Sequence, residues 1–355
     1  MAWASSAVSA TPPTCSATRS ASSRPTSTTR TRPSASISSC PRSAAAPARP
    51  STRSLSLSLP NPRLTLGLRS YDYTKGKLDQ LVDIIIESGA KLFVSAVGVP
   101  PKHIVEKLHK HGIIYMNMIG HPKHVAKCAA LGVDIICAQG GEGGGHTGDV
   151  ATTILIPAVV EECKKYTSPL TGKPVQVLAA GGIHNGQLLA AALMMGAAGV
   201  WVGTRFVLSQ EAGAPESHKE AVRTASFDDT VRTVIFTGRP LRVRKNPYIM
   251  NWNEERTQEI KDLTASGKLP FEADLDALMA GDAEKLAALK STAGVTVSDD
   301  EDPEEVLDQF RPYLMGQCAA VVNDNKPAKA IVDEFINDAV AVIKQGNAYI
   351  GAAKL

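Results

Sequence analysis

The first 71 residues of this 355-residue chain contain no aspartate, glutamate or lysine, yet they contain nine arginines. Subtracting these nine charges from the formal net charge of +3 leaves −6 on the remainder, so the near-balanced total hides two unlike regions. Serine and threonine make up 27 of the 71 residues, and aromatic residues are almost absent. This composition excludes a packed hydrophobic core in the segment.

Further absences restrict the function. No apolar run approaches the ~20 residues of a membrane-spanning helix, so we expect no membrane partner. The near-balanced total charge indicates no nucleic-acid partner. The six cysteines show no CxxC pair, and no two His, Asp or Glu residues have a spacing typical of metal ligands, so no metal is expected. Cys137 lies in a predicted strand, where a buried thiol is the expected state.

Three interpretations of residues 1–70 remain open. The segment is a disordered tail, an organelle transit peptide (also rich in Arg and Ser and poor in acids), or text outside the natural reading frame. A frame shifted back by one base allows Ala2 to Ser20 to read GLGVIGGVGYTPDMLRDQI and Pro33 to Ala46 to read PFGVDLLLPQVGGG. Both decoded stretches resemble a buried strand that ends in glycine. This spacing favours the out-of-frame interpretation, with a cytoplasmic location, whereas a genuine transit peptide would predict mitochondria.

From residue 71 onward, short apolar runs alternate with amphipathic segments, which predicts a parallel sheet covered by helices. The expected strands are residues 91–99, 113–118, 133–138, 175–180 and 200–202, and the expected helices are residues 77–88, 102–111, 122–131, 152–165 and 185–195. With two decoded strands and one upstream of Met1, the α/β fold would be a TIM-type (β/α)₈ barrel, incomplete at the N-terminus. An open doubly wound sheet is the alternative.

The remaining residues predict a separate organisation. Residues 250–355 contain helical segments of mixed charge and no clear strand, which indicates a helical appendage. We therefore expect an aberrant or disordered segment over 1–70, a barrel portion over 71–249 and a helical region over 250–355. Of the histidines outside the predicted loops, His103, His109, His111 and His218 are expected at the surface, and His121 is expected to cap a helix.

Three consecutive predicted strands end in glycine, at residues 140–148, 181–182 and 203. Barrels bind phosphate with the loops that follow their last two strands, so Gly181, Gly182, Gly203 and the hydroxyl of Thr204 predict a phosphate site. The first of the three loops also contains His146, flanked by glycines and by no apolar residue. An imidazole in such a loop is a candidate base near neutral pH.

The motifs AQGGEGGGHTGD, AAGGI, VWVGTRF and TGRPLRVRKNP together resemble the nitronate monooxygenase family, formerly called 2-nitropropane dioxygenases. The resemblance covers residues 71–252 and extends more weakly through MGQCAA to the C-terminus. It implies an FMN-containing TIM-barrel flavoprotein, an oxidoreductase. The decoded GLGVIGG and FGVDLLLPQ are similar to the family's second and third strands, which supports the out-of-frame interpretation.

The resemblance also implies roles for individual residues. The FMN phosphate would lie on Gly182, Gly203 and Thr204, with Gly181 shaping the turn, and the flavin would lie against Gln139 and Gly144. His146 would remove the α-proton of a nitroalkane; with a nitronate it would only hold the anion.

The expected activity follows from the same resemblance. O₂ would be the second substrate, and the products would be a carbonyl compound and nitrite. Flavin-dependent NAD(P)H reductases of the enoyl or quinone type share similar loops and are one alternative. A non-catalytic truncated fragment is another, because a barrel without its first strands would have open edges.

Overall fold

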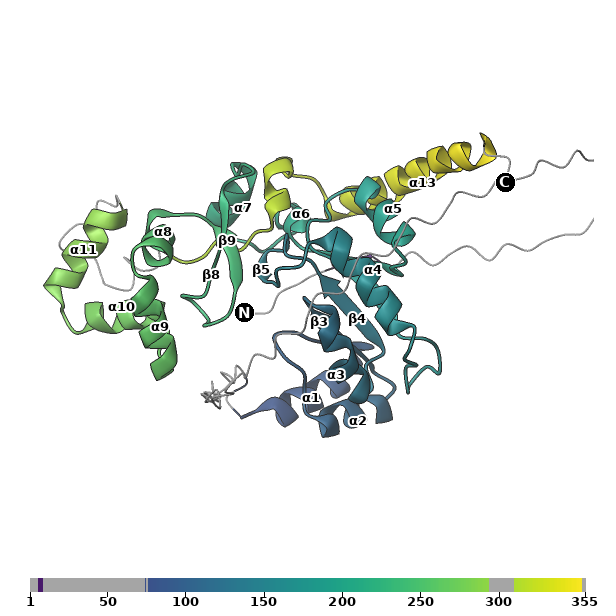
Figure 1. Cartoon of the computed structure of the whole chain (residues 1–355), viewed down its shortest axis with the longest axis horizontal. Coiled ribbons are helices and arrows are strands. Elements are labelled where there is room, and N and C mark those ends of the chain that lie inside the picture. Colours follow the sequence, from purple (N-terminus) through teal and green to yellow (C-terminus); the bar gives the residue numbers. More distant parts are fainter. Residues whose placement is uncertain (1–5, 9–73, 75, 294–309, 353–355) are drawn as a thin grey trace, which may run out of the picture. The chain divides into compact units, whose positions relative to one another are not determined.

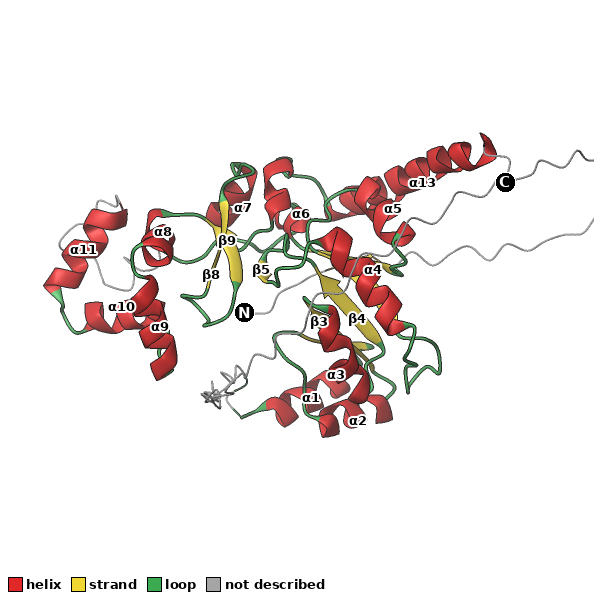
Figure 2. Ribbon diagram, in the orientation of Figure 1, coloured by secondary structure: helices red, strands yellow, loops and turns green. Residues whose placement is uncertain are grey.

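The computed structural model describes residues 6–8, 74, 76–293 and 310–352, and within them the main feature is a six-stranded sheet (Figures 1 and 2). Five strands are parallel, in the order β7, β6, β4, β3, β2, and β1 pairs antiparallel with β7. The strands are β1 Ser6–Val8, β2 Leu92–Ser95, β3 Ile114–Ile119, β4 Ile135–Gln139, β6 Gln176–Ala180 and β7 Gly199–Val202. All five strands predicted after residue 71 are therefore present.

Helices alternate with these strands, as the sequence pattern predicts. They are α1 Leu78–Glu87, α2 Lys102–Lys110, the 3₁₀ helix η1 Pro122–His124 with α3 Val125–Ala130, α4 Thr152–Cys163 and α5 Gly186–Met194. The ends follow from local chemistry: Asn185 caps α5 by accepting a hydrogen bond from the Leu188 amide, and Gly196 follows the helix with a φ of 93°, which favours glycine.

The two faces of the sheet are both apolar but are covered differently. Val177 and Ala179 of β6 pack in the cluster that includes α4 and α5, whereas Ala180 lies on the opposite face with Met116 and Cys137. The Cys137 thiol is fully buried, and burial raises its pKa to about 12, which confirms a buried structural thiol. The apolar runs of the strands are explained by this two-sided burial.

The described strands form a curled half-barrel rather than a closed one. Along the order of the sheet, β2 has a strand neighbour on one side only. Strand β1 lies beside β7, where a complete (β/α)₈ barrel would have a parallel strand, but its direction is antiparallel. The decoded strands, like the transit-peptide and tail interpretations, concern residues that lie outside the described ones apart from residues 6–8.

A second, three-stranded antiparallel sheet was not predicted. It consists of β5 Gly145–His146, β9 Leu241–Arg244 and β8 Thr230–Thr233, in that order. The hairpin of β8 and β9 shares one hydrophobic cluster with the helices that follow it. These are α8 Pro247–Glu254, α9 Thr257–Ser266, α10 Pro270–Met279 and α11 Ala283–Ala293.

The last part of the chain returns to the parallel sheet. Two short helices, α6 Thr204–Val207 and α7 Glu216–Arg223, lie between β7 and β8. After α11, the last described elements are the 3₁₀ helix η2 Gln317–Val321 and the helix α13 Ala328–Ala352. Helix α13 lies alongside α5 (Figure 1), and a Cβ on Gly186 would overlap Asp338 and the Phe335 carbonyl. Of the helices in the described part of the chain, none has the length and apolarity to span a bilayer.

At the amino-terminal end of the strands, a buried carboxylate accepts hydrogen bonds from three donors. Asp134, 3% exposed, accepts hydrogen bonds from the Tyr115 amide at 2.7 Å, the Ser168 hydroxyl at 2.5 Å and His109 Nε2 at 2.9 Å. His109 is therefore not the free surface residue that the sequence suggested. The same correction applies to His218, whose Nε2 lies 2.9 Å from the Leu314 carbonyl oxygen.

Candidate functional site

The predicted histidine loop is held as a strand rather than left free. Residues 145–146 form β5, in which His146 pairs with Leu241 of β9. The Gln139 side chain, at the end of β4, donates from Nε2 to the His146 carbonyl at 2.9 Å. Two connections therefore fix the backbone of His146, one from the parallel sheet and one from the hairpin.

The His146 ring is partly buried and meets a hydroxyl. Its Nε2 lies 2.9 Å from Thr237 Oγ1, and Thr237 lies in the connection between β8 and β9. Burial, followed by the positive charge of Arg239, lowers the pKa of His146 below its usual 6.5. The imidazole is therefore mostly neutral at pH 7, which is the form able to accept a proton.

Arginine side chains fasten the hairpin to the glycine loop. Arg242 donates from Nε and Nη2 to the Gly141 carbonyl at 3.1 and 2.9 Å. Arg232 donates to the Gly148 carbonyl at 3.1 Å and pairs with Asp149. A hollow of about 240 Å³ lies beside these contacts, and Glu142 and Gln317 also line it. The two guanidinium groups are thus anchors for the loop.

The glycines of this loop permit close approach of other backbone segments. A Cβ on Gly144 would lie 2.5 Å from the Met315 carbonyl carbon, and a Cβ on Gly316 would lie 2.7 Å from the Glu142 carbonyl oxygen. A Cβ on Gly143 would lie 2.5 Å from Gln139 Nε2. The predicted flavin contacts of Gln139 and Gly144 remain predictions. The structure gives both residues a packing role within the loop.

The loops after β6 and β7 contribute three glycines, Gly181, Gly182 and Gly203, to a cradle that is open at Gly203 and packed against Gly140 at Gly181. Gly181 and Gly182 have φ values of 90° and 75°, and around a Cβ built on Gly203 there is no atom within 4 Å. Among the described residues, the backbone N–H groups of these three glycines donate no hydrogen bond to other backbone groups. An anion requires donors without another partner and room beside them; the three amides lack a backbone partner and there is room at Gly203, so the cradle fits a phosphate group there.

Thr204 connects the cradle to the end of the chain. Its Oγ1 accepts a hydrogen bond from the Gly316 amide at 2.9 Å, and its hydroxyl also hydrogen-bonds the Cys318 side chain. The backbone amide of Gln317 donates a hydrogen bond to the Glu142 carbonyl at 3.0 Å. The segment 315–317 therefore forms one side of the site, and the weak MGQCAA motif was the only sequence signal for it.

Two of the three glycine-rich exits are joined directly. The Gly140 amide donates to the Ala180 carbonyl at 2.9 Å. The Thr152 hydroxyl lies 2.9 Å from the Gly181 carbonyl oxygen and 2.8 Å from Glu142 Oε2, so its one hydrogen is shared between the two acceptors. The Glu142 carboxylate accepts from the amide and hydroxyl of Thr152, so it caps α4 and orients this threonine. Since β4, β6 and β7 are neighbours, the histidine loop and the cradle occupy one edge of the sheet.

The other histidines near this edge have local roles. His121 caps η1 by accepting a hydrogen bond from the Lys123 amide, as predicted. His184 Nδ1 lies 3.1 Å from the Gly182 carbonyl oxygen, so it stabilises the cradle turn. Within the described ranges, no group of three or more His, Cys, Asp or Glu residues is placed to hold a metal ion.

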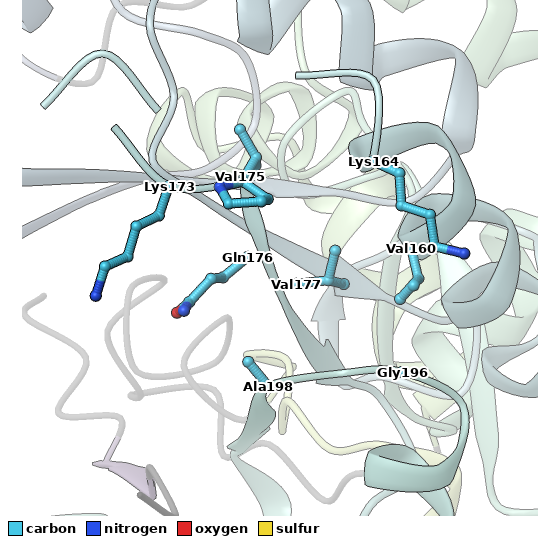
Figure 3. Close-up of a pocket in the computed structure, with 9 residues that line it drawn as sticks. Val160, Lys164, Lys173, Val175, Gln176, Val177, Gly196 and Ala198 are labelled. Carbon is cyan, nitrogen blue, oxygen red and sulfur yellow. The ribbon is translucent and has the colours of Figure 1, made fainter. Parts of the chain in front are cut away.

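A cavity larger than the hollow at the glycine loop lies away from this edge. It measures about 400 Å³, and Figure 3 shows that its lining comes from the start of β6, the turn before β7 and the end of α4. Lys173, Gln176 and Val160 are among the lining residues. This is the amino-terminal end of the parallel strands, where α/β sheets do not place their chemistry, so the cavity is not assigned to the site.

Comparison with known proteins identifies the family. The nitronate monooxygenase family matches residues 63–338, more than half of the chain, and the chain belongs to this family. A protein of Mycobacterium tuberculosis that is named as a monooxygenase is 31% identical over 265 residues, which are 75% of this chain and 63% of that protein.

A second relative has a different printed activity. The (3aS,4S,5R,7aS)-5-hydroxy-7a-methyl-1-oxo-octahydro-1H-indene-4-carboxyl-CoA dehydrogenase of Mycobacterium tuberculosis is 39% identical over 168 residues, 47% of this chain and 45% of that enzyme. The chain therefore spans between about half and two thirds of the length of these relatives.

The fold also matches solved structures. FabK from Thermotoga maritima superposes with a TM-score of 0.57 at 25% identity, over 77% of this chain and 76% of that chain. The five parallel strands with their covering helices therefore belong to a known α/β architecture.

Proposed function

We propose that this protein is an FMN-dependent nitronate monooxygenase that oxidises alkyl nitronates and nitroalkanes with O₂ to carbonyl compounds and nitrite. The observation that carries the proposal is the position of His146, a partly buried imidazole of lowered pKa on the same sheet edge as an open glycine cradle. Membership of the nitronate monooxygenase family supports the choice of reaction.

The cofactor proposal depends on the cradle. Gly182, Gly203 and the Thr204 hydroxyl would hold the FMN phosphate, because the amides of the two glycines have no backbone partner among the described residues and the space beside Gly203 is open, and Gly181 would shape the turn through its positive φ. Bound FMN would supply the electron transfer and the reactivity toward O₂. Gln139 and Gly144 would line the flavin from the β4 side.

The protein contributes proton transfer and charge. Neutral His146 would accept the acidic α-proton of a nitroalkane and then face the resulting nitronate as an imidazolium. With a nitronate as substrate, no proton is removed, and His146 would only help to hold the anion. Arg239, whose charge acts on His146, would favour an anionic substrate at the same place.

A second candidate is oxidation of a coenzyme A thioester. The observation that favours it is the 39% identity to a carboxyl-CoA dehydrogenase, higher than the identity to the longer-matching monooxygenase. The α-proton of a thioester is also acidic, so the same base would serve both substrates. Nitrite release distinguishes the first candidate, and dehydrogenation of an acyl-CoA distinguishes the second.

The test is turnover of the chain reconstituted with saturating FMN. We expect nitrite release from primary nitroalkanes and their nitronates without consumption of NADH; an NAD(P)H reductase would instead consume NADH. His146→Ala should lower turnover of neutral nitroalkanes by about 100-fold or more, because a general base contributes that much to proton abstraction. His111→Ala, which removes an exposed histidine at the end of α2, is the matched control. Undiminished nitroalkane turnover in the His146 variant would exclude His146 as the base.

A further inference from the structure

Thr237 occupies a position that the sequence did not single out. Its hydroxyl oxygen lies 2.9 Å from His146 Nε2 and 3.2 Å from the carbonyl oxygen of Arg239, two residues further along the same loop. It is therefore placed between the imidazole and a backbone acceptor. The 91-residue separation from His146 explains why no sequence pattern indicates the pair.

A count of hydrogens assigns the direction of both bonds. The Thr237 hydroxyl has one hydrogen, and a carbonyl oxygen can only accept. No other hydrogen bond to the Arg239 carbonyl is found among the described residues, so this carbonyl would lose its one described protein donor if the hydroxyl turned toward the ring. The hydroxyl therefore donates to Arg239 and accepts from the ring, and that requires a hydrogen on His146 Nε2.

We propose that Thr237 is a positioning residue that holds His146 in the Nε2–H tautomer and leaves Nδ1 as the atom that accepts the substrate proton. The proton-accepting role rests on the proposed function; the tautomer does not. The proton moves from the substrate α-carbon to Nδ1, the C–H electron pair stays on the substrate, and the ring becomes an imidazolium that keeps its bond to Thr237.

The surroundings keep the two side chains in register. His146 and Leu241 pair across β5 and β9, and the Thr237 loop immediately precedes β9. The Arg239 guanidinium donates to the Val97 carbonyl at 3.2 Å, which fastens the same loop to the exit of β2. The Thr237 hydroxyl thus lies on a loop that is fixed by the β5–β9 pairing and by the contact with Val97, as a preorganised site requires.

The test measures the tautomer directly and does not need bound flavin or turnover. Protein labelled with ¹⁵N-histidine would be studied by long-range ¹H–¹⁵N correlation well above the pKa of His146, with the His146 signals identified by their absence in His146→Asn. We expect a protonated Nε2 and an unprotonated Nδ1 in the wild-type chain. A wild-type ring protonated at Nδ1 would overturn the proposal.

Matched variants separate positioning from general damage to the hairpin. Thr237→Val removes the hydroxyl at nearly constant volume and should produce a mixture of tautomers, whereas Thr237→Ser keeps the hydroxyl and should keep the Nε2–H form. The control is Thr233→Val in β8, which removes a hydroxyl that bonds Asn253 and does not contact His146. An Nε2–H ring that persists unchanged in Thr237→Val would contradict the proposal.

The kinetic consequence has its own signature. Thr237→Val should lower kcat/KM for neutral nitroalkanes by about tenfold, with nitronate turnover within about twofold, because only the neutral substrate needs the base. Thr237→Ser should recover most of the loss. If no nitro compound is turned over by the wild-type chain, the proposed function fails while the tautomer measurement still decides the role of Thr237. Equal losses for both substrates would show a structural role and would overturn the proposal.

Discussion

The two ends of the parallel strands differ in how their polar groups are hydrogen-bonded. At the amino-terminal end, the carboxylate of Asp134 is buried and bonded to three donors from three parts of the chain. At the carboxyl-terminal end, Gly181, Gly182 and Gly203 present backbone amides that have no backbone partner among the described residues. One end is satisfied internally and serves stability, whereas the amides at the other end are available to the proposed ligand.

The largest expected effect comes from changing the half-barrel sheet itself, because its strands connect the two ends. Leu92, Val94 and Met118, which line the inner face of the half-barrel, are only partly buried, and β2 has one described strand neighbour. Replacing residues 1–46 by a version that carries the decoded strands should extend the sheet and cover more of this face. We expect that version to retain flavin through gel filtration, and the chain as given to lose most of its flavin.

The measurement is flavin absorbance per mole of protein after equal loading with FMN. A version with the same replaced residues in scrambled order is the control for composition. Equal flavin content in the given chain and the decoded version would contradict the out-of-frame interpretation.

At the stability end, Asp134→Ala should lower the free energy of unfolding by about 3 kcal/mol, because it leaves buried donors without an acceptor. The loss would be measured by urea denaturation. The matched control is Asp79→Ala, since Asp79 pairs with His103 at the surface and should change stability little. We expect the KM of the folded fraction to stay the same in Asp134→Ala; a changed KM would argue against the separation of the two ends.

At the ligand end, two glycines should respond differently to one added methyl group. Gly181→Ala places a Cβ 2.7 Å from the Gly140 carbonyl oxygen at a φ of 90°, and should destabilise the fold by about 2 kcal/mol. Gly203→Ala meets open space and should leave the melting temperature nearly constant, but its methyl group would enter the cradle. We expect about tenfold weaker FMN binding, some 1.4 kcal/mol, by titration calorimetry.

The opposite ranking of these two variants would contradict the assignment of the cradle. Unchanged FMN affinity in Gly203→Ala would mean that the phosphate lies elsewhere.

The smallest expected effect concerns charge. Burial and Arg239 both lower the pKa of His146, and the neutral ring is the base in the proposed function, so nitroalkane turnover should rise with pH with its midpoint below pH 6.5. Arg239→Gln removes one cause and should move this rise to higher pH. The pH profile of kcat/KM for a nitroalkane is the measurement, and the nitronate is the control substrate. A rise that moves to lower pH would show that Arg239 acts otherwise.

The sequence was informative where the physical signal is local. Continuous apolar runs gave the five parallel strands, because strands buried on both faces must be apolar throughout. Glycine at strand exits gave the three loops of the site. The hairpin was not predicted because β8 and β9 are short and contain arginine, and because β5 pairs with β9 across nearly a hundred residues.

The same limit applies to single residues of the site. His146 stands out in a glycine loop, whereas Thr237, Arg242 and Gly316 gain meaning only through contacts with distant segments. Gly144 illustrates a different limit. A glycine signals that something approaches closely, but the sequence does not say whether that is a ligand or, as at Met315, another part of the chain.

The contact of Gly316 with Thr204 also has a consequence for synthesis of the protein. The two residues are 112 positions apart, so the strands and glycine loops leave the ribosome long before the segment that completes the wall beside them. A nascent chain can assemble the parallel sheet early, yet it gains its finished cradle only near the end of translation. Under the proposed function, cofactor capture would be coupled to completion of the polypeptide, and prematurely terminated products would compete poorly for the cofactor.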